Sequence, residues 1–308
     1  MKLHFEGDLP YQAAAIEAVC DLFRGQEICR TEFTVTMRTK PIEDGIVAFK
    51  QVSLDGMEES EQGGIGNRLT LLDDEIEKNL SEIQLRNGLA RTNIQSGDFS
   101  VEMETGTGKT YVYLRTAFEL NKRYGFTKFA VVVPSVAIKE GVNKTLEITR
   151  EHFELLYPSA KGYEFFQYDS TKLGQVRNFA TSPNIQIMVI TIQSLVRKDY
   201  AVVYKDSEKT GGEKPIDLIR ATRPILIIDE PQSVDGGKDG KGKQALDEMN
   251  PLCTLRYSAT HVEKHNMVYR LDAVDAYEQK LVKQIEVAAA TVSGGSNKPY
   301  VKLISVSN

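Results

Sequence analysis

From residue 98 onward the chain alternates between short apolar runs and segments with the spacing of amphipathic helices. Strand candidates cover residues 98–103, 128–133, 163–168, 185–190, 224–228 and 252–260, and 128–133 contains a continuous, largely β-branched apolar run. Strands that are apolar throughout, without alternation, are typical of a parallel sheet that is buried on both faces. Helical segments lie between them, at 111–120, 136–149 and 216–220. The pattern predicts an α/β fold, with a mainly parallel sheet flanked by helices.

The beginning of the chain is less regular. A helical apolar face covers residues 13–23 behind a proline, and a second helical pattern runs over 73–89. Residues 34–38 alternate as a strand does, whereas the glycine-rich stretch 56–66 is expected to be a flexible loop. We interpret residues 36–95 as an insertion before the phosphate-binding loop described next, and its role stays open.

The first chemical signal is the stretch Thr-Gly-Thr-Gly-Lys-Thr, from Thr105 to Thr110, between a predicted strand and a predicted helix. The glycines allow backbone N–H groups to turn toward a phosphate, Lys109 can reach the β- and γ-phosphates, and Thr110 can hold Mg²⁺. The helix that follows adds its free N–H groups and its dipole to the anion site. Met103 stands where the usual pattern has its first glycine, so a plain glycine-rich turn with a surface lysine is the alternative.

The second signal is the pair Asp229-Glu230 at the end of the apolar run 224–228. In phosphoryl-transfer sites of this kind one carboxylate holds Mg²⁺ and the next orients the attacking water. A strand that ends in two carboxylates also occurs by chance, so the pair gains its weight from its position after the phosphate loop.

Other polar residues also stand at the ends of predicted strands. They are Pro134-Ser135, Thr191 and Ser258-Ala259-Thr260. The carboxyl ends of parallel strands meet at one edge of the sheet, where the ligands of open α/β folds bind. Near the start of the chain, the amide of Gln12 can pair with the N6 donor and the N7 acceptor of adenine. A solvated polar residue is the alternative interpretation of Gln12.

Composition narrows the class of protein. The 308-residue chain has a formal net charge of −5, so its overall charge does not indicate nucleic-acid binding, although a local basic groove is compatible with it. The cysteines Cys20, Cys29 and Cys253 are odd in number and lack metal-ligand spacing, which indicates reduced thiols in a cytoplasmic protein. The sequence shows no signal peptide and no apolar run long enough to span a membrane.

The order of these signals resembles the first motor domain of superfamily 2 helicases and translocases. Members of that superfamily often replace the first glycine of the phosphate loop, which removes the objection raised by Met103. More specifically, the chain resembles the restriction (Res) subunit of type III restriction-modification enzymes. The resemblance rests on residues 3–6, 103–116, 229–232 (Asp-Glu-Pro-Gln) and 269–277, and it covers most of the chain.

The resemblance implies a RecA-like P-loop NTPase domain that binds ATP and Mg²⁺ and acts as an ATP-dependent motor on double-stranded DNA. A methyltransferase (Mod) subunit would be its partner and would recognise the DNA sequence, and a nuclease domain would cut. The implied nucleotide residues are Gln12 for adenine, Thr105, Gly106, Thr107, Gly108, Lys109 and Thr110 for the phosphates, Thr110 and Asp229 for Mg²⁺, and Lys109, Asp229 and Glu230 for catalysis. Ser258 and Thr260 would couple nucleotide to DNA, and Pro134, Ser135 and Thr191 would contact the DNA backbone.

On this basis we divide the chain into an N-terminal helix with the adenine-reading glutamine (1–35), the insertion (36–95), a first RecA-like motor domain (96–270) and the start of a connection to a second motor domain (271–308). Residues 271–287 are expected to be helical or extended, and 291–308 to alternate as a strand. Only about 48 residues follow Thr260, too few for a second motor domain with its arginine finger or for a nuclease. The chain alone is therefore expected to hydrolyse ATP weakly and to cut no DNA.

Three other functions share part of these features. A type I restriction motor subunit or a DNA-repair helicase would have the same core, but Glu-Pro-Gln at 230–232 and the segment 269–277 favour type III. A nucleotide-gated scaffold module would bind ATP without work on DNA. DNA-stimulated hydrolysis by the full-length protein would separate the scaffold from the motors.

Overall fold

The computed structural model of the protein describes residues 5–36, 61–94, 96–196, 201–236, 240–261 and 264–283. The strands are β1 Arg30–Thr36, β2 Glu61–Asn67, β3 Asp98–Met103, β4 Lys128–Val133, β5 Glu164–Gln167, β6 Gln186–Thr191, β7 Ile225–Asp229, β8 Cys253–Ser258 and β9 Met267–Leu271. The α-helices are α1 Pro10–Cys20, α2 Asp73–Arg86, α3 Lys109–Tyr124, α4 Val136–Leu156, α5 Gly174–Thr181, α6 Gln193–Val196, α7 Pro215–Thr222, α8 Pro231–Val234, α9 Lys241–Asp247 and α10 Ala273–Glu278. Short 3₁₀ turns lie at Asp21–Phe23, Pro158–Ala160, Val202–Tyr204 and Glu208–Thr210.

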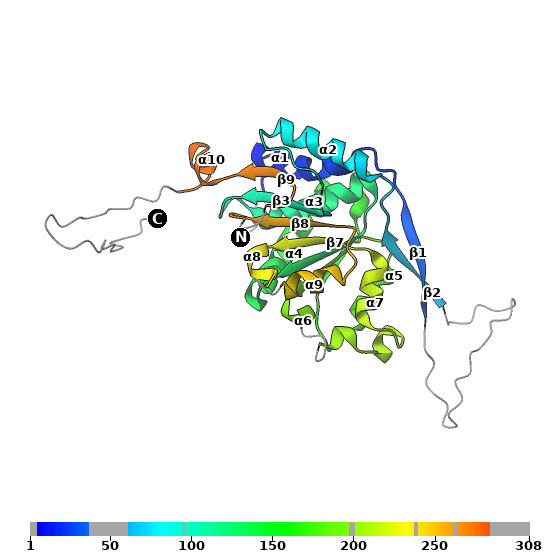
Figure 1. Ribbon diagram of the computed structural model, residues 1–308. Coiled ribbons are helices and arrows are strands. Elements are labelled where there is room, and N and C mark those ends of the chain that lie inside the picture. Colours follow the sequence, from blue (N-terminus) through cyan, green and yellow to red (C-terminus); the bar gives the residue numbers. More distant parts are fainter. Residues whose placement is uncertain are drawn as a thin grey trace, which may run out of the picture.

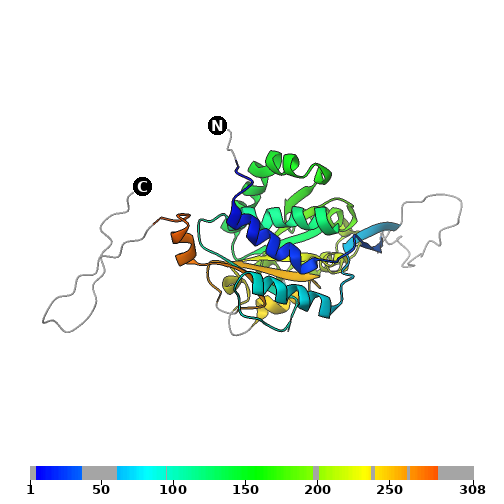
Figure 2. The same cartoon turned by 90° about the horizontal axis from the view of Figure 1, so that it is seen from above.

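A seven-stranded sheet in the order β5-β6-β4-β7-β8-β3-β9 forms the centre of the molecule (Figure 1). Each neighbouring pair of strands in it is parallel. A separate antiparallel ribbon of β1 and β2 stands at the opposite end of the sheet from α10 in both views (Figures 1 and 2). The predicted α/β fold, with a parallel sheet between helices, is confirmed.

Alternate residues of each strand pack against two different helical layers, because successive side chains of a strand point to opposite faces. On β4, Phe129, Val131 and Val133 share a core with α1 to α4, whereas Ala130 and Val132 pack with α5 to α9. Every residue of β4 is buried, and the same holds for β3, β6, β7 and β8. Burial on both faces is the physical reason why β4, β6 and β7 are largely apolar without alternation, whereas β3 and β8 bury polar side chains at alternate positions.

The six strands expected from residue 98 onward are present as β3 to β8, with small shifts at their ends. The sequence pattern does not predict β9. This strand lies at the edge of the sheet and has only five residues, of which the fourth, Arg270, is exposed, so its apolar pattern is short and interrupted. The segment from residue 271, expected to be helical or extended, begins with the last residue of β9 and continues into α10.

The glycine-rich stretch, where it is described, is a strand and not the expected flexible loop. It forms β2, which pairs with β1 in antiparallel register and sets Gly64 opposite Phe33. A Cβ at Gly64 would lie 2.2 Å from the Phe33 ring, and one at Gly66 would lie 2.8 Å from the Thr222 carbonyl oxygen. The glycines therefore provide room for close packing, which composition alone does not distinguish from flexibility.

Replacing Gly66 by alanine is expected to lower the free energy of unfolding by about 1–3 kcal/mol, because the added methyl group overlaps backbone of α7. Gly63 is the matched control, since a Cβ there would meet nothing within 4 Å. Urea unfolding of the full-length protein would measure both variants. Equal stability of Gly66→Ala and Gly63→Ala would contradict the packing of β2 on α7.

Parts of several expected elements lie outside the described residues. They are 37–38 of the strand expected over 34–38, 56–60 of the glycine-rich stretch, 284–287 of the segment after β9, and all of 291–308. Among the residues that are described, no helix is long and apolar enough to cross a membrane.

The parallel sheet brings the candidate residues to one edge. Because all seven strands run in the same direction, their carboxyl ends lie together, and each is followed there by a loop or a helix. The register shows this directly: Glu102 of β3 pairs with Ser258 of β8, and Asp229 of β7 pairs with Tyr257 of β8. The phosphate loop, the Asp-Glu pair and the Ser-Ala-Thr sequence therefore follow three adjacent strands.

Candidate nucleotide site

The phosphate loop joins β3 to α3, and glycine makes its shape possible. Gly106 and Gly108 have φ angles of 85° and 89°, in the left-handed region that residues with side chains rarely adopt. α3 begins immediately after Gly108, so the free N–H groups of its first turn face the loop. Met103 is the fully buried last residue of β3, which explains why a large side chain is accommodated there.

Gln12 of α1 lies against this loop. Its Nε2 donates to the Thr107 carbonyl oxygen at 3.0 Å, and the Tyr11 hydroxyl donates to the same oxygen at 3.1 Å. Gly108 allows the approach, because a Cβ there would lie 2.7 Å from Gln12 Nε2. Hydrogen bonds thus join the N-terminal helix directly to the phosphate loop, although their residues are far apart in the sequence.

An ion pair crosses the site, with Lys109 Nζ 3.0 Å from Glu230 Oε1. The other carboxylate oxygen of Glu230 accepts a hydrogen bond from Gln232 Nε2 at 2.7 Å and lies 3.0 Å from Ser258 Oγ. Ser258 Oγ also lies 2.8 Å from the Thr260 carbonyl oxygen, and its single proton can serve only one of these acceptors at a time. One hydrogen-bond network therefore joins the phosphate loop, the Asp-Glu pair and the Ser-Ala-Thr sequence.

The backbone of Glu230 is strained. Its φ angle of 55° lies in the left-handed region, a conformation that costs a residue with a side chain roughly 1–3 kcal/mol. Its N–H donates to the Tyr257 carbonyl oxygen at 3.0 Å. Burial acts to raise the pKa of the Glu230 carboxyl, but hydrogen bonds from Gln232 and Lys109 outweigh burial, so this pKa is lowered. Glu230 is therefore ionised at neutral pH, as a general base must be.

Asp229 has the opposite electrostatic environment. Burial, and secondly the negative charge of Glu230, raise the pKa of its carboxyl to about 6, against smaller opposing effects of Lys109 and Tyr113. The Tyr113 hydroxyl lies 3.4 Å from Asp229 Oδ2, and Tyr113 also bonds to Thr110. A buried carboxylate with this excess of negative charge is a group that a divalent cation would neutralise.

These residues fit a nucleoside triphosphate with a divalent cation. A Cβ added at Gly106 would meet nothing within 4 Å, so open space lies beside the loop. The Lys109 amine and the first turn of α3 suit phosphate, and the Thr110 hydroxyl and Asp229 carboxylate are the hard oxygen ligands that Mg²⁺ prefers. Within the described ranges, no group of three or more His, Cys, Asp or Glu side chains could hold a metal. A cation here would therefore also need oxygens from the nucleotide and from water, as Mg²⁺ commonly takes.

The residues expected to contact DNA lie at the ends of the neighbouring strands β4 and β6. Ser135 is the N-cap of α4, and its hydroxyl accepts a hydrogen bond from a backbone N–H of the first turn at 3.3 Å. Thr191 Oγ1 lies 3.0 Å from Ser194 Oγ. Gln193 Nε2 donates to the Pro134 carbonyl oxygen at 2.7 Å and so ties the two strand ends together.

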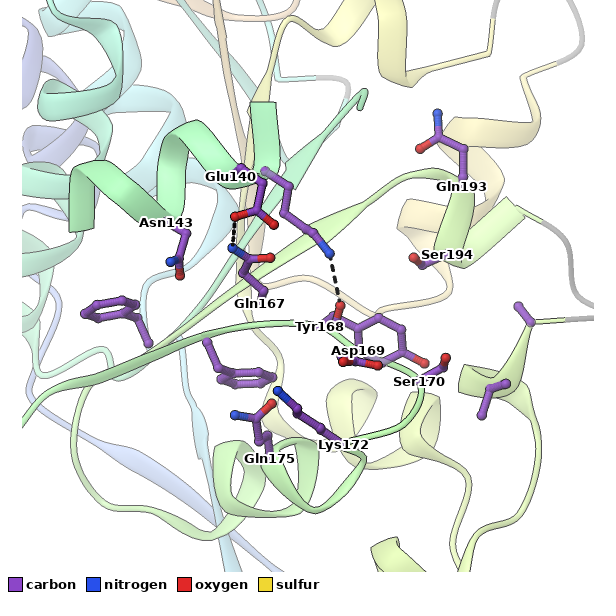
Figure 3. A pocket seen from close by; sticks show the side chains of 15 residues that line it. Glu140, Asn143, Gln167, Tyr168, Asp169, Ser170, Lys172, Gln175, Gln193 and Ser194 are labelled. Carbon is purple, nitrogen blue, oxygen red and sulfur yellow. Dashed lines mark hydrogen bonds between the residues drawn. The ribbon is translucent and has the colours of Figure 1, made fainter. Parts of the chain in front are cut away.

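A polar hollow of about 840 Å³ adjoins these strand ends and does not include the phosphate loop. Figure 3 shows Gln193 and Ser194 beside it, with Asp169, Ser170 and Lys172 around its lower part. Its charged lining residues are Lys139, Lys172, Glu140 and Asp169. The hollow thus offers amides, hydroxyls and two lysines close to Ser135 and Thr191.

Three residues of the site were not singled out by sequence reasoning. Gln232 bridges Glu230 and Ser258, Tyr113 contacts Asp229, and Tyr11 supports Thr107. The Asp-Glu-Pro-Gln sequence was the available signal for Gln232. Tyr113 and Tyr11 carry no signal of their own, because a tyrosine in a helix beside apolar residues is usually a core residue.

The fold and the site define a P-loop nucleotide-binding domain: a parallel sheet, a glycine-rich loop with lysine and threonine before α3, and an Asp-Glu pair after a neighbouring strand. A family model described as type III restriction enzyme, res subunit, matches residues 8–263. The chain therefore belongs to the family of type III restriction enzyme Res subunits, which confirms the resemblance drawn from its sequence.

Curated relatives agree with this family. The EcoP15I Res subunit of Escherichia coli is 31% identical over 304 residues, which cover 91% of this chain and 28% of the relative. The EcoPI Res subunit of Escherichia phage P1 is 29% identical over the same shares of both chains. The StyLTI Res subunit of Salmonella typhimurium is 33% identical over 62% of this chain and 22% of its own length. The chain thus spans under a third of the length of these relatives.

Among solved structures, the SWI2/SNF2 ATPase core of Sulfolobus solfataricus in complex with dsDNA matches with a TM-score of 0.35 and 16% identity, over 60% of this chain and 31% of that one. The UvsW helicase of bacteriophage T4 matches with a TM-score of 0.34 and 12% identity, over 63% of this chain and 55% of that one. Similarity at this level carries no argument about function.

Proposed function

We propose that this chain binds ATP with Mg²⁺ and hydrolyses it. The observation that carries the proposal is the convergence of a loop lysine with two strand-end carboxylates, in which Lys109 Nζ lies 3.0 Å from Glu230 Oε1. Lys109 and the first turn of α3 would bind the phosphates, and Thr110 with Asp229 would hold Mg²⁺. Glu230 would accept a proton from the attacking water. Bound Mg²⁺ supplies neutralisation of the charge on the transferred phosphoryl group.

We further propose that hydrolysis drives movement along double-stranded DNA. Ser258 lies within reach of both Glu230 and the Thr260 carbonyl oxygen, so a change at Glu230 can alter the loop that carries Thr260. Pro134, Ser135 and Thr191 would contact the DNA backbone together with the adjoining hollow, where Lys139 and Lys172 would pair with phosphates, although Glu140 and Asp169 balance their charge. Hydroxyls, amides and lysines position a phosphate backbone without reading its sequence.

In the whole protein this motor would serve restriction in the cytoplasm. A partner methyltransferase (Mod) subunit would recognise the DNA sequence, and a nuclease domain beyond this part of the chain would cut both strands. The match to a family of restriction Res subunits supports this assignment. The motor chain by itself would then hydrolyse ATP weakly and leave DNA intact.

The test is ATP hydrolysis by the full-length protein with its methyltransferase partner, with and without DNA that carries its recognition sites. Stimulation by DNA that is lost in Lys109→Ala is the expected result. Lys122→Ala, at the exposed end of α3, is the matched control and should retain full activity. An equal rate of ATP hydrolysis with and without DNA would favour a nucleotide-gated module. Absence of hydrolysis from the wild-type complex would refute the proposal.

Gln12 is expected to select adenine. Its Nε2 donates to the Thr107 carbonyl oxygen at 3.0 Å and to the Tyr11 hydroxyl at 3.3 Å, while its Oε1 is suited to the N6 amino group of the base. Gln12→Ala should therefore reduce the preference for ATP over GTP by roughly tenfold or more, a loss typical of unpaired base-edge contacts. Competition binding with fluorescent nucleotides would measure it.

Tyr11→Phe is the control for the adenine prediction. It removes the other donor to the Thr107 carbonyl oxygen and the hydroxyl that accepts from Gln12 Nε2, but it leaves the glutamine side chain itself unchanged. A retained preference in Tyr11→Phe and a lost one in Gln12→Ala would support adenine reading. Equal loss in both variants would instead assign Gln12 to support of the loop.

A further inference from the structure

We infer that Arg256 is a positioning residue for Glu230, acting through the segment that follows β7. Arg256 lies in β8 and is only 2% exposed. Its Nε donates to Asp98 Oδ1 at 3.0 Å, and its Nη1 donates to both carboxylate oxygens of Asp235 at 2.8 and 2.9 Å. The guanidinium thereby joins Asp98, the first residue of β3, to Asp235, the C-cap residue of α8. The inference rests on the proposed ATP hydrolysis.

The same face of β8 holds the segment from residue 230 to 235 at two points. Ser258 and Arg256 are two residues apart on the strand, so their side chains point to the same side. Ser258 contacts the beginning of the segment at Glu230, and Arg256 contacts its end at Asp235. The short helix α8 lies between these points, and the Asp235 N–H bonds back to the Pro231 carbonyl oxygen at 2.9 Å.

Such anchoring matters because Glu230 has a left-handed backbone. A strained conformation persists only where its surroundings determine it from both sides. On the side of β7, strand pairing and the bond from Glu230 N–H to Tyr257 fix the chain. On the side of α8, the contact of Arg256 Nη1 with both carboxylate oxygens of Asp235 is the charged anchor, and it would set where the Glu230 carboxylate points.

A purely structural role for this cluster is the competing explanation. Arg256 and Asp98 are buried, and Lys243 Nζ adds a further positive charge 3.7 Å from Asp98 Oδ2. Buried ion clusters of this kind are often replaceable by uncharged side chains without loss of stability, whereas removal of one member leaves buried charge unpaired. The effect on stability and the effect on positioning can therefore be separated by removing either the charge of Arg256 alone or the charges of Arg256, Asp98 and Asp235 together.

The experiment uses the full-length protein with its partner and two variants. Arg256→Met leaves Asp235 without its charged partner and Asp98 with Lys243 alone, and we expect a lower melting temperature and loss of hydrolysis. The triple variant Arg256→Met, Asp98→Asn, Asp235→Asn removes Arg256 and both of its carboxylate partners and leaves only the charge of Lys243, whose side chain is 45% exposed, and we expect it to regain the melting temperature of the wild type. We expect its kcat to stay at least tenfold lower, with unchanged ATP affinity, because misplacement of a catalytic group acts on the rate.

Hydrogen exchange of the amides of residues 230–235 provides a readout without nucleotide. Faster exchange in the triple variant than in the wild type is expected if Arg256 holds the segment. A triple variant with wild-type melting temperature, exchange and kcat would overturn the inference. Absence of ATP hydrolysis in the wild-type complex would refute the proposed function. The exchange rates would still show whether Arg256 positions the segment, because they are measured without nucleotide.

Discussion

Replacing Glu230 by glutamine is expected to slow ATP hydrolysis by roughly 10²–10³-fold and to leave ATP binding intact. The amide keeps the shape of the side chain and its contacts with Gln232 and Ser258, but it cannot accept a proton from water. It also removes the negative charge that pairs with Lys109. The amine is then free for phosphate, so the affinity for ATP should be equal to that of the wild type or higher.

Single-turnover hydrolysis and equilibrium binding of a fluorescent ATP analogue would measure the two effects separately. Glu147→Gln, on the exposed part of α4, is the matched change and should leave both quantities as in the wild type. Weaker binding in Glu230→Gln with a normal rate for bound nucleotide would contradict the role of Glu230 as the base.

Replacing Asp229 by asparagine is expected to abolish Mg²⁺-dependent hydrolysis and at the same time to stabilise the fold. The ionised carboxylate is disfavoured by burial and by Glu230, which raise its pKa to about 6. Asparagine has nearly the same shape without this charge, so the free energy of unfolding should rise by about 2 kcal/mol at neutral pH. Active-site groups often oppose stability in this way, because they are arranged for their ligand and not for the fold.

The stability effect of Asp229 has a definite pH dependence. Its pKa is about 6 in the folded chain and near 3.8 in the unfolded one, so the folded chain holds the proton more tightly. The stability that protonation provides is complete below the unfolded pKa and is lost as pH rises through about 6. Asp229→Asn should therefore match the wild type near pH 4 and exceed it at pH 8.

Thermal unfolding at several pH values without nucleotide or Mg²⁺ would follow this prediction, since a bound cation would itself stabilise the wild type. Asp217→Asn, in which an exposed carboxylate of α7 is changed, serves as the control and should show no such gain at pH 8. A melting temperature for Asp229→Asn that is lower than the wild type at pH 8 would contradict the electrostatic picture of the site.

The sequence by itself determined the class of fold and predicted the core of the candidate nucleotide site. Nearly continuous apolar runs such as 129–133 and 187–190 are typical of strands covered on both faces, so they predict a parallel sheet with helices on each side. Gly106, Gly108, Lys109 and Thr110 are neighbours in the chain, and the shape of their loop depends on local backbone freedom. Local causes of this kind can be recognised without knowledge of the fold.

Only the tertiary structure decided which distant residues meet. The bond from Gln12 to the loop, the bridge of Gln232 to Ser258, and the position of Arg256 behind the Asp-Glu segment depend on the order of β7, β8 and β3 in the sheet. These partners cannot be recognised from the residue types, because an amide or a guanidinium side chain can equally well be exposed to solvent.

The strands β2 and β9 show the same limit for secondary structure. Glycines in β2 and an exposed arginine in β9 contradict the local pattern of a strand, yet both segments gain their stability from neighbours that are distant in sequence. Position 66 needs a glycine because the backbone at Thr222 leaves no room for a side chain there. β9 forms because it pairs with the edge of β3 that β8 does not occupy. Pairing and close packing are non-local, and they override local preference where the two disagree.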